Sequence, residues 1–257
     1  LTKWAASLKP LPKNCTYFNF TASHDGVGVR PLEGLVPDDE FTALVEGMKK
    51  RGGFVSEKQN SDGSLSPYEL NITYFDAFSD YNGSQSIQER RYICSQLIML
   101  SLQGVPGIYF HNLTATRNNM RGVSITGRYR TINRKKWKYE ELVDLLSDPD
   151  TNTYRIFNRY KDILLKGNEH PAFHPFGSQT VYEIDSDLFC ILRKDPGNTE
   201  RVLVVANLTN KKVKKSLNEL DLPIEKKSKY DDVLTGQTRI EGEELNLDAF
   251  QVAWLVV

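Results

Sequence analysis

A histidine and an aspartate stand side by side in the segment Phe18-Asn-Phe-Thr-Ala-Ser-His-Asp-Gly-Val-Gly28. The apolar residues before them predict a buried strand over residues 16–22, packed on both faces. The two glycines that follow permit a sharp turn away from the end of this strand. Barrel enzymes place their chemistry at the C-terminal ends of strands, so His24 and Asp25 are candidate catalytic groups. The alternative interpretation is a His-Asp pair that only caps a turn.

Arginine is the second residue type that could do chemistry, at Arg30 and in the segment Arg128-Tyr-Arg-Thr-Ile-Asn-Arg134. A planar guanidinium donates to two hydroxyls, a carboxylate or a phosphate at once, which suits the binding of sugars and anions. The alternatives are a surface loop with scattered positive charge and, for Arg30, an exposed ion pair with Glu33.

The composition excludes several classes of protein. Lysine and arginine total 33, as do aspartate and glutamate, and this balance argues against a nucleic-acid-binding surface. No run of 18 apolar residues exists, so we expect no membrane-spanning segment. No spacing of histidine, cysteine and aspartate is typical of a metal site. Cys94 and Cys190 lie in apolar stretches far from Cys15, which predicts buried free thiols in a reducing compartment and hence a cytoplasmic location.

The elements that must position these residues follow from periodicity and turn signals. We expect helices and strands to alternate in the first two thirds of the chain, with a long irregular segment over residues 112–137. The expected helices are 38–52, 87–103, 138–146 and 151–166. The expected strands are 16–22, 54–57 and 108–111, with a polar loop over residues 59–67.

After Pro171 the pattern changes to short apolar runs separated by turn signals, which predicts an antiparallel sheet domain. Trp254 lies in the last of these runs and is expected to be a core aromatic residue. The expected strands are 179–184, 188–193, 201–208, 213–216, 239–241 and 250–257.

The segment Thr21-Ala-Ser-His-Asp-Gly-Val-Gly28 resembles the last catalytic motif of glycoside hydrolase family 13, the α-amylase superfamily. It is most similar to the sucrose phosphorylase branch. This resemblance implies that Asp25 is the carboxylate that stabilises the transition state. It also implies that His24 binds hydroxyls of the glucosyl ring.

Two further segments resemble the same branch. The arginine-rich segment is similar to the Gly-Arg-x-Ile-Asn-Arg sequence that follows the last barrel strand, which implies that Arg134 contacts the sugar and that Arg130 matches the preceding arginine. The segment Ser66-Pro-Tyr-Glu-Leu-Asn-Ile-Thr-Tyr-Phe75 is similar to the mobile acceptor loop. Tyr68 matches this loop, but Glu69 replaces a glutamine. A carboxylate there repels an anionic acceptor unless an arginine pairs with it.

Arg30-Pro31 also departs from sucrose phosphorylases. It is closer to relatives that act on glucosylglycerate or on phosphorylated sucrose, so Arg30 is expected to lie near an anionic acceptor. Arg128 and Arg130 are further candidates for the cations that a phosphate requires.

The resemblance implies an α/β fold: the last part of a (β/α)8 barrel over residues 1–170, including the acceptor loops, and a small antiparallel β domain over 171–257. The implied activity is retaining transfer of an α-glucosyl group from a glucosylglycerate- or sucrose-type glucoside to inorganic phosphate, with no metal or organic cofactor. The family's nucleophile and acid/base motifs have no counterpart here. Because the chain also opens at Leu1, we interpret it as a fragment, completed by an N-terminal barrel segment in the same or a companion chain. The alternative is an inert remnant that binds carbohydrate or a protein partner.

Overall fold

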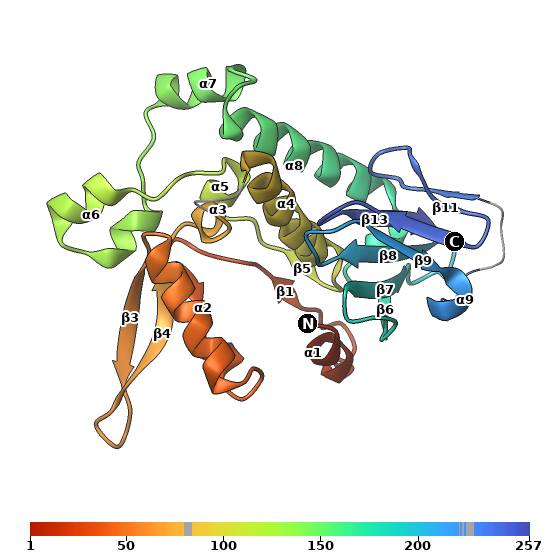
Figure 1. The fold of residues 1–257 in the computed structure, drawn as a ribbon, viewed down its shortest axis with the longest axis horizontal. Helices are drawn as coiled ribbons and strands as arrows, with labels where there is room; N and C mark the ends of the chain where they lie inside the picture. Colours follow the sequence, from red (N-terminus) through yellow and green to blue (C-terminus); the bar gives the residue numbers. More distant parts are fainter. Residues whose placement is uncertain (80–83, 221, 223, 225–228) are drawn as a thin grey trace. The chain divides into compact units, whose positions relative to one another are not determined.

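The computed structural model describes residues 1–79, 84–220, 222, 224 and 229–257 (Figure 1). They form two compact units, and each is described by itself. Unit 1 consists of residues 1–19, 89–107 and 161–257, and unit 2 consists of residues 20–88 and 108–160.

Unit 1 is built around an antiparallel sheet with the strand order β13-β8-β7-β6 (Figure 1). Its strands are β6 (Ser178–Tyr182), β7 (Leu188–Lys194), β8 (Arg201–Asn207) and β13 (Val252–Val256). Phe189 and Ile191 of β7 share a core with residues of α4 (Gln85–Ser101) and α8 (Asn152–Glu169), including Leu97 and Ile163. The alternate side chains of β7, such as Cys190, pack in a second core. Both faces of the central strands are therefore covered, which explains their continuous apolar runs.

The second core of unit 1 joins this sheet to another antiparallel sheet, with the strand order β10-β11-β12-β9. Its strands are β9 (Val213–Ser216), β10 (Lys229–Asp231), β11 (Thr238–Glu241) and β12 (Glu244–Leu247). The remaining elements of unit 1 are α1 (Thr2–Ser7), β1 (Phe18–Asn19), β5 (Val105–Pro106), η3 (Pro171–Phe173) and α9 (Leu217–Leu220).

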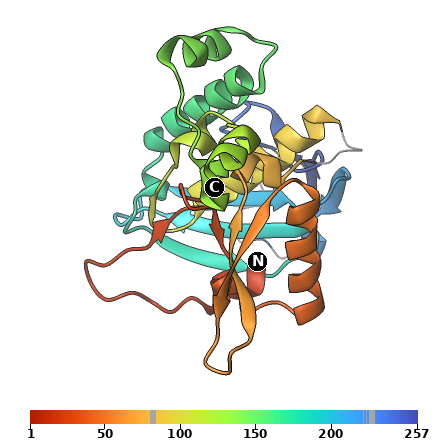
Figure 2. The ribbon, with the colours of Figure 1, turned by 90° about the vertical axis from the view of Figure 1, so that its left-hand side faces the viewer.

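Unit 2 contains a three-stranded antiparallel sheet with the order β2-β4-β3. Strands β3 (Phe54–Gln59) and β4 (Leu65–Asn71) form a hairpin beside α2 (Asp38–Lys50), and β2 (Val27–Gly28) pairs with the end of β4 (Figure 2). The other elements are η1 (Arg30–Leu32), α3 (Tyr74–Ala77), α5 (Phe110–Leu113), α6 (Met120–Thr126), η2 (Tyr129–Asn133) and α7 (Tyr139–Ser147).

Most of the expected elements are confirmed. Helices α2, α4, α7 and α8 and strand β3 lie where the periodicity placed them, and each strand predicted after residue 171 is present in an antiparallel sheet. Trp254 is 1% exposed, as expected for a core aromatic. Strands β10 and β12 and the helices α6 and η2 within the segment expected to be irregular were not predicted.

The expectation of a buried strand over residues 16–22 is wrong. Strand β1 comprises only Phe18 and Asn19 and pairs in parallel with β5. Phe18 and Phe20 are 67% and 57% exposed. Within the described part of the chain β1 has one hydrogen-bonded neighbour, so its side chains lack the cover that a central barrel strand receives.

Two further expectations need correction. The strand expected over residues 108–111 is instead β5, which ends at Pro106 and is followed by the short helix α5. The acceptor-loop segment expected over residues 66–75 is mostly strand β4, because residues 65–71 pair with β3, and Glu69 and Leu70 also pair with β2. The polar residues 60–64 only form the tight turn of this hairpin.

The predicted domain boundary at residue 170 remains a prediction. The unit that holds the C-terminal sheets also includes residues 1–19 and 89–107, and compactness alone does not delimit a catalytic barrel. The described helices include none that is both long and apolar enough to cross a membrane.

Candidate active site

A tight turn over residues 23–26 carries the His-Asp pair. Ser23 and Gly26 exchange main-chain hydrogen bonds of 3.1 and 3.2 Å, and the Ser23 hydroxyl accepts from the Asp25 amide at 3.2 Å. Gly26 has φ +134°, and a Cβ there would lie 2.2 Å from the carbonyl oxygen of Leu70 in β4. Only glycine fits this position. Gly28, expected to help the turn, instead pairs with Glu69 in regular strand geometry.

The Asp25 carboxylate lies among three basic side chains. Its Oδ1 accepts a hydrogen bond from Nη2 of Arg134 at 2.5 Å. Nε2 of His24 lies 3.4 Å from the same oxygen, and Nη1 of Arg130 lies 3.6 Å from it. Arg134 also donates from Nε to the carbonyl oxygen of His24 at 3.2 Å, so one guanidinium holds both the side chain and the main chain of the pair. The side chain of Asp25 is 34% exposed and that of His24 is 62% exposed, which leaves both accessible to a ligand.

The structure also brings Tyr68 and Glu69 to this cluster. Arg130 donates from Nε and Nη2 to the two carboxylate oxygens of Glu69, at 3.0 and 2.9 Å, and from Nη2 to the Tyr68 hydroxyl at 3.0 Å. The Glu69 side chain is only 7% exposed. Hydrogen bonding to this carboxylate and its charge raise the pKa of Arg130. A guanidinium thus bridges the Glu69 and Asp25 carboxylates.

Two aromatic side chains that the sequence analysis did not single out hold the segment around Arg134. Tyr109 donates to the carbonyl oxygen of Asn133 at 2.6 Å, and Nε2 of His111 lies 3.0 Å from the carbonyl oxygen of Lys135. These carbonyls belong to the residues on either side of Arg134. Burial lowers the pKa of His111, which favours a neutral ring that donates from Nε2.

Tyr109 also responds to the charges of the cluster. Burial raises the pKa of its phenol most, the Arg134 guanidinium lowers it and the Asp25 carboxylate raises it further. The only signal in the sequence was the position of both residues within the segment 108–111, which was interpreted as a barrel strand.

Arg30 does not share these contacts in the described residues. Its Nε lies 3.6 Å from Oε1 of Glu33, and both side chains are about half exposed, at 53% and 50%. This is the ion pair that the alternative interpretation named, and the acceptor role of Arg30 remains a prediction. Arg128 precedes η2 and is exposed.

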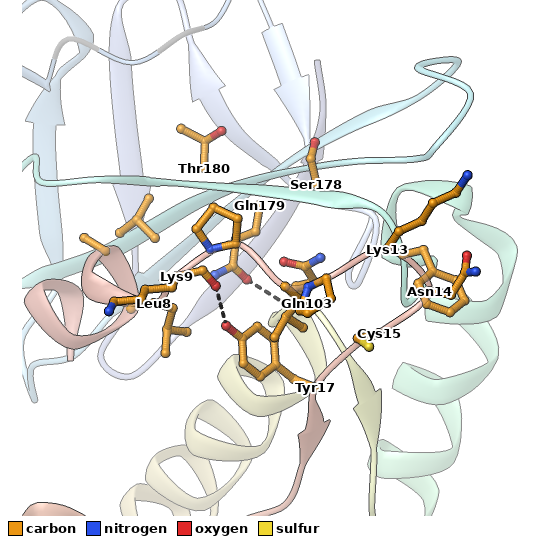
Figure 3. Close-up of a pocket in the computed structure, with 17 residues that line it drawn as sticks. Leu8, Lys9, Lys13, Asn14, Cys15, Tyr17, Gln103, Ser178, Gln179 and Thr180 are labelled. Atoms are coloured by element: carbon orange, nitrogen blue, oxygen red, sulfur yellow. Dashed lines mark hydrogen bonds between the residues drawn. The ribbon is translucent and has the colours of Figure 1, made fainter.

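The chain also has a cavity of about 700 Å³ in unit 1, between residues 5–17 and strand β6 (Figure 3). The Tyr17 hydroxyl donates to the carbonyl oxygen of Lys9 there, and the main-chain N–H of Gln103 donates to Oε1 of Gln179. None of the predicted site residues lines it. Among the described residues no group of histidine, cysteine, aspartate and glutamate could hold a metal ion.

The sequence was compared with those of known proteins. No protein-family model matches the chain. Glucosylglycerate phosphorylase of Spirochaeta thermophila is 41% identical over 210 residues, which cover 82% of this chain and 36% of that protein. Glucosylglycerate phosphorylase of Escherichia coli K12 is 34% identical over 99% of this chain and 44% of its own length. Sucrose phosphorylase of Streptococcus mutans is 26% identical over 58% of this chain.

The chain belongs to the sucrose phosphorylase branch of glycoside hydrolase family 13. It corresponds to the C-terminal part of these proteins and spans about a third to two fifths of the length of the glucosylglycerate phosphorylases it matches. A solved structure, sucrose 6F-phosphate phosphorylase from Thermoanaerobacter thermosaccharolyticum, is 22% identical with a TM-score of 0.62. The aligned residues cover 74% of this chain and 36% of the chain in that structure. This likeness confirms the expected fold class of a family 13 barrel segment followed by an antiparallel β domain.

Proposed function

We propose that this family 13 segment supplies the transition-state stabiliser and sugar-binding residues of a retaining α-glucosyl phosphorylase. In the proposed reaction a carboxylate nucleophile attacks the anomeric carbon of a glucoside, and an acid protonates the departing oxygen. Inorganic phosphate then opens the covalent glucosyl-enzyme to give glucose 1-phosphate. Neither step requires a metal ion or an organic cofactor.

The observation that carries this proposal is the environment of Asp25. The Asp25 carboxylate accepts a hydrogen bond from Arg134 at 2.5 Å, and its side chain remains one-third exposed. The glucosyl ring gains positive charge as it approaches an oxocarbenium-like transition state, so a fixed carboxylate beside it stabilises that state more than the ground state. His24 and the remaining N–H groups of Arg134 are proposed to orient the ring by hydrogen bonds to its hydroxyls.

The pairing of Glu69 with Arg130 supports an anionic acceptor. A lone carboxylate at Glu69 would repel phosphate or a carboxylated acceptor, but the bidentate guanidinium neutralises it. Arg130 is 41% exposed beyond this pair and keeps its third nitrogen toward Asp25. The arrangement therefore admits an anionic group where an unpaired glutamate would exclude one.

We propose glycerate as the acceptor in the synthetic direction, ahead of a sugar phosphate and fructose. Three glucosylglycerate phosphorylases are 34–41% identical to the chain, whereas two sucrose phosphorylases are 26–27% identical. A single small carboxylate also needs fewer cations than a phosphate dianion. Arg30 is proposed to lie on the acceptor side and to contribute one of these cations.

The proposed partner is the N-terminal barrel segment that these relatives have and this sequence does not match. The nucleophile and the acid/base of a retaining enzyme must lie about 5 Å apart across the anomeric carbon, and both are proposed to come from that segment. An orphaned donor beside the turn is consistent with a further contact there: Nδ2 of Asn133 is buried and has no acceptor among the described residues. The free, buried thiols Cys94 and Cys190 support a reducing, cytoplasmic location.

An acceptor panel tests this function in the complete protein. With glucose 1-phosphate as donor, the initial rates with glycerate, fructose, glycerol and fructose 6-phosphate are compared. We expect glycerate to give the highest kcat/KM. Fructose as the best acceptor would return the protein to a sucrose-type activity, and no transfer to any acceptor would favour the inert alternative.

A further inference from the structure

Asn71, the last residue of β4, joins the two carboxylate-bearing parts of the cluster. Its side chain is fully buried, and its Nδ2 donates to the main-chain oxygen of Asp25 at 3.1 Å and to Oε1 of Glu69 at 2.5 Å. Its Oδ1 accepts from the hydroxyl of Ser56 in β3 at 2.6 Å. One amide therefore contacts the turn of residues 23–26, Glu69 of β4 and Ser56 of β3.

The chemistry of these partners fixes the orientation of the amide. A carbonyl oxygen and a carboxylate oxygen can only accept, so the NH2 group of Asn71 must face Asp25 and Glu69. The opposite orientation would place the amide oxygen against both acceptors inside a buried site, which is costly. The remaining oxygen then faces Ser56, whose hydroxyl can donate. Asn71 has the required two donors and one acceptor in this arrangement.

Asn71 and Arg130 hold the same two groups from different sides. Arg130 binds the Glu69 carboxylate in a bidentate manner and approaches the Asp25 side chain, whereas Asn71 binds one Glu69 oxygen and the Asp25 main chain. The guanidinium is 41% exposed and the amide is not exposed. The exposed contact is open to ligand, and the buried one is suited to fixing geometry.

We propose that Asn71, oriented by Ser56, is a positioning residue that fixes the distance between the Asp25 turn and the Glu69 carboxylate. The groups that bind the glucosyl ring, near Asp25, and those that bind the acceptor, near Glu69, then keep a constant separation during transfer. This inference rests on the proposed phosphorylase function. It assigns Asn71 no contact with substrate, because the side chain is buried behind Glu69 and the turn.

The test compares four variants of the complete protein with glycerate as acceptor and glucose 1-phosphate as donor. Asn71→Asp has nearly the same shape but replaces the NH2 donors with a carboxyl group that faces the Glu69 carboxylate and the Asp25 carbonyl oxygen. Ser56→Ala removes the orienting hydroxyl. Ser56→Thr keeps that hydroxyl. Asn60→Asp is the matched control, because Asn60 lies in the turn of the same hairpin and its Nδ2 bonds only to the exposed Ser64 hydroxyl among its described contacts.

We expect Asn71→Asp to lower kcat and to raise the KM for glycerate, with a fall in kcat/KM of about tenfold or more, the effect of losing a hydrogen bond to a charged group. The KM for glucose 1-phosphate should change less than that for glycerate. Ser56→Ala should show the same pattern at about threefold, on the same basis, and Ser56→Thr and Asn60→Asp should match wild type.

The outcomes separate a positioning role from a structural one. Loss of folded protein alone lowers kcat and leaves both KM values unchanged, which would overturn the proposal, as would kinetics for Asn71→Asp equal to those of Asn60→Asp. If Asn71→Asp yields no folded protein, the Ser56→Ala and Ser56→Thr pair decides, and equal KM values in that pair contradict the proposal. An inactive wild-type protein is a different result, since it refutes the proposed function itself.

Discussion

Two arginines, one in each unit, bind different partners: Arg193 donates to buried main-chain carbonyls, and Arg130 donates to carboxylates near the surface. Arg193 on β7 is fully buried and donates to the carbonyl oxygens of Ser178, Ser101 and His174 at 3.2, 2.9 and 2.9 Å. Burial lowers its pKa to about 10. Arg130 in unit 2 is 41% exposed and binds carboxylates, and its pKa is raised by Glu69.

The two regions use charge differently. Ser101 ends helix α4, so Arg193 satisfies a carbonyl at the negative end of that helix and ties β7 to it. The hydroxyl of Ser101 also accepts from the Trp254 indole at 2.8 Å, which closes a buried polar network. In the unit 2 cluster the pair of Arg134 with Asp25 instead lies where solvent and ligands reach it, so this pair contributes little to stability. We therefore expect the Arg193 network to govern folding and the Arg130 cluster to govern activity.

The largest expected effect is on activity. Asp25→Asn in the complete protein should lower kcat by about a thousandfold or more, roughly 4 kcal/mol of transition-state stabilisation. The near-isosteric change should leave the free energy of unfolding within about 1 kcal/mol of wild type, since the pairs it removes are partly exposed. Asp62→Asn, in the turn of the β3–β4 hairpin, is the matched control. A normal kcat for Asp25→Asn would remove Asp25 from its proposed role.

The next effect is on stability and tests the comparison directly. Arg193→Met removes the donor from the buried carbonyls it satisfies and should lower the free energy of unfolding by about 3 kcal/mol. Urea denaturation measures this, with Arg201→Met on the adjacent strand β8 as control. Arg134→Met, which removes the partly exposed pair with Asp25, should cost less than about 1 kcal/mol in the same assay. Equal losses for Arg193→Met and Arg134→Met would show that the two regions do not differ in this way.

A smaller effect concerns the buried His111. Because burial lowers its pKa, the unfolded chain takes up a proton near pH 6.5 that the folded chain does not. The free energy of unfolding should therefore fall as the pH drops below about 6.5, by at most about 1.4 kcal/mol per pH unit from this group. Denaturation of wild type and His111→Gln between pH 7.5 and 5 isolates the contribution of His111 to the pH dependence of the free energy of unfolding. Identical pH slopes in the two proteins would show that His111 is not held neutral.

The smallest expected effect belongs to Arg30. If this cation serves the acceptor side, Arg30→Ala should raise the KM for glycerate about tenfold, as for one charge-assisted hydrogen bond, and leave the KM for glucose 1-phosphate unchanged. Steady-state kinetics with Glu33→Ala as the companion variant measure this. An unchanged KM for glycerate would assign Arg30 to its exposed pair with Glu33.

The sequence was sufficient for the parts of this molecule that local pattern determines. Helices α2, α4 and α8 and the C-terminal sheets follow from periodicity and turn residues. Gly26 is required by a positive φ and a close approach to β4, which its place after the His-Asp pair indicated. The resemblance placed Asp25, Arg130 and Arg134 in one site, and the structure brings their side chains within hydrogen-bond or ion-pair distance.

The remaining features depend on contacts between distant segments. The start of strand β4 was assigned to a polar loop over residues 59–67, and the resemblance placed residues 66–75 in an acceptor loop, although the end of this strand is buried by pairing on both edges. Asn71 reaches Asp25 across 46 positions in the chain, and Tyr109 reaches Asn133 across 24. Such partners leave no periodic signal in the sequence. The prediction that Phe18 and Phe20 are buried failed for a related reason, since an apolar residue type predicts burial only where another element covers the side chain.

If the cluster around Asp25 belongs to a phosphorylase site, cleavage of the glucoside must depend on inorganic phosphate. The complete protein is incubated with glucosylglycerate with and without inorganic phosphate, and glucose 1-phosphate, glucose and glycerate are quantified over the initial phase. We expect equal amounts of glucose 1-phosphate and glycerate in the presence of phosphate, and little free glucose in its absence. Release of glucose at the same rate in the absence of phosphate, or no release of glycerate under either condition, would contradict it.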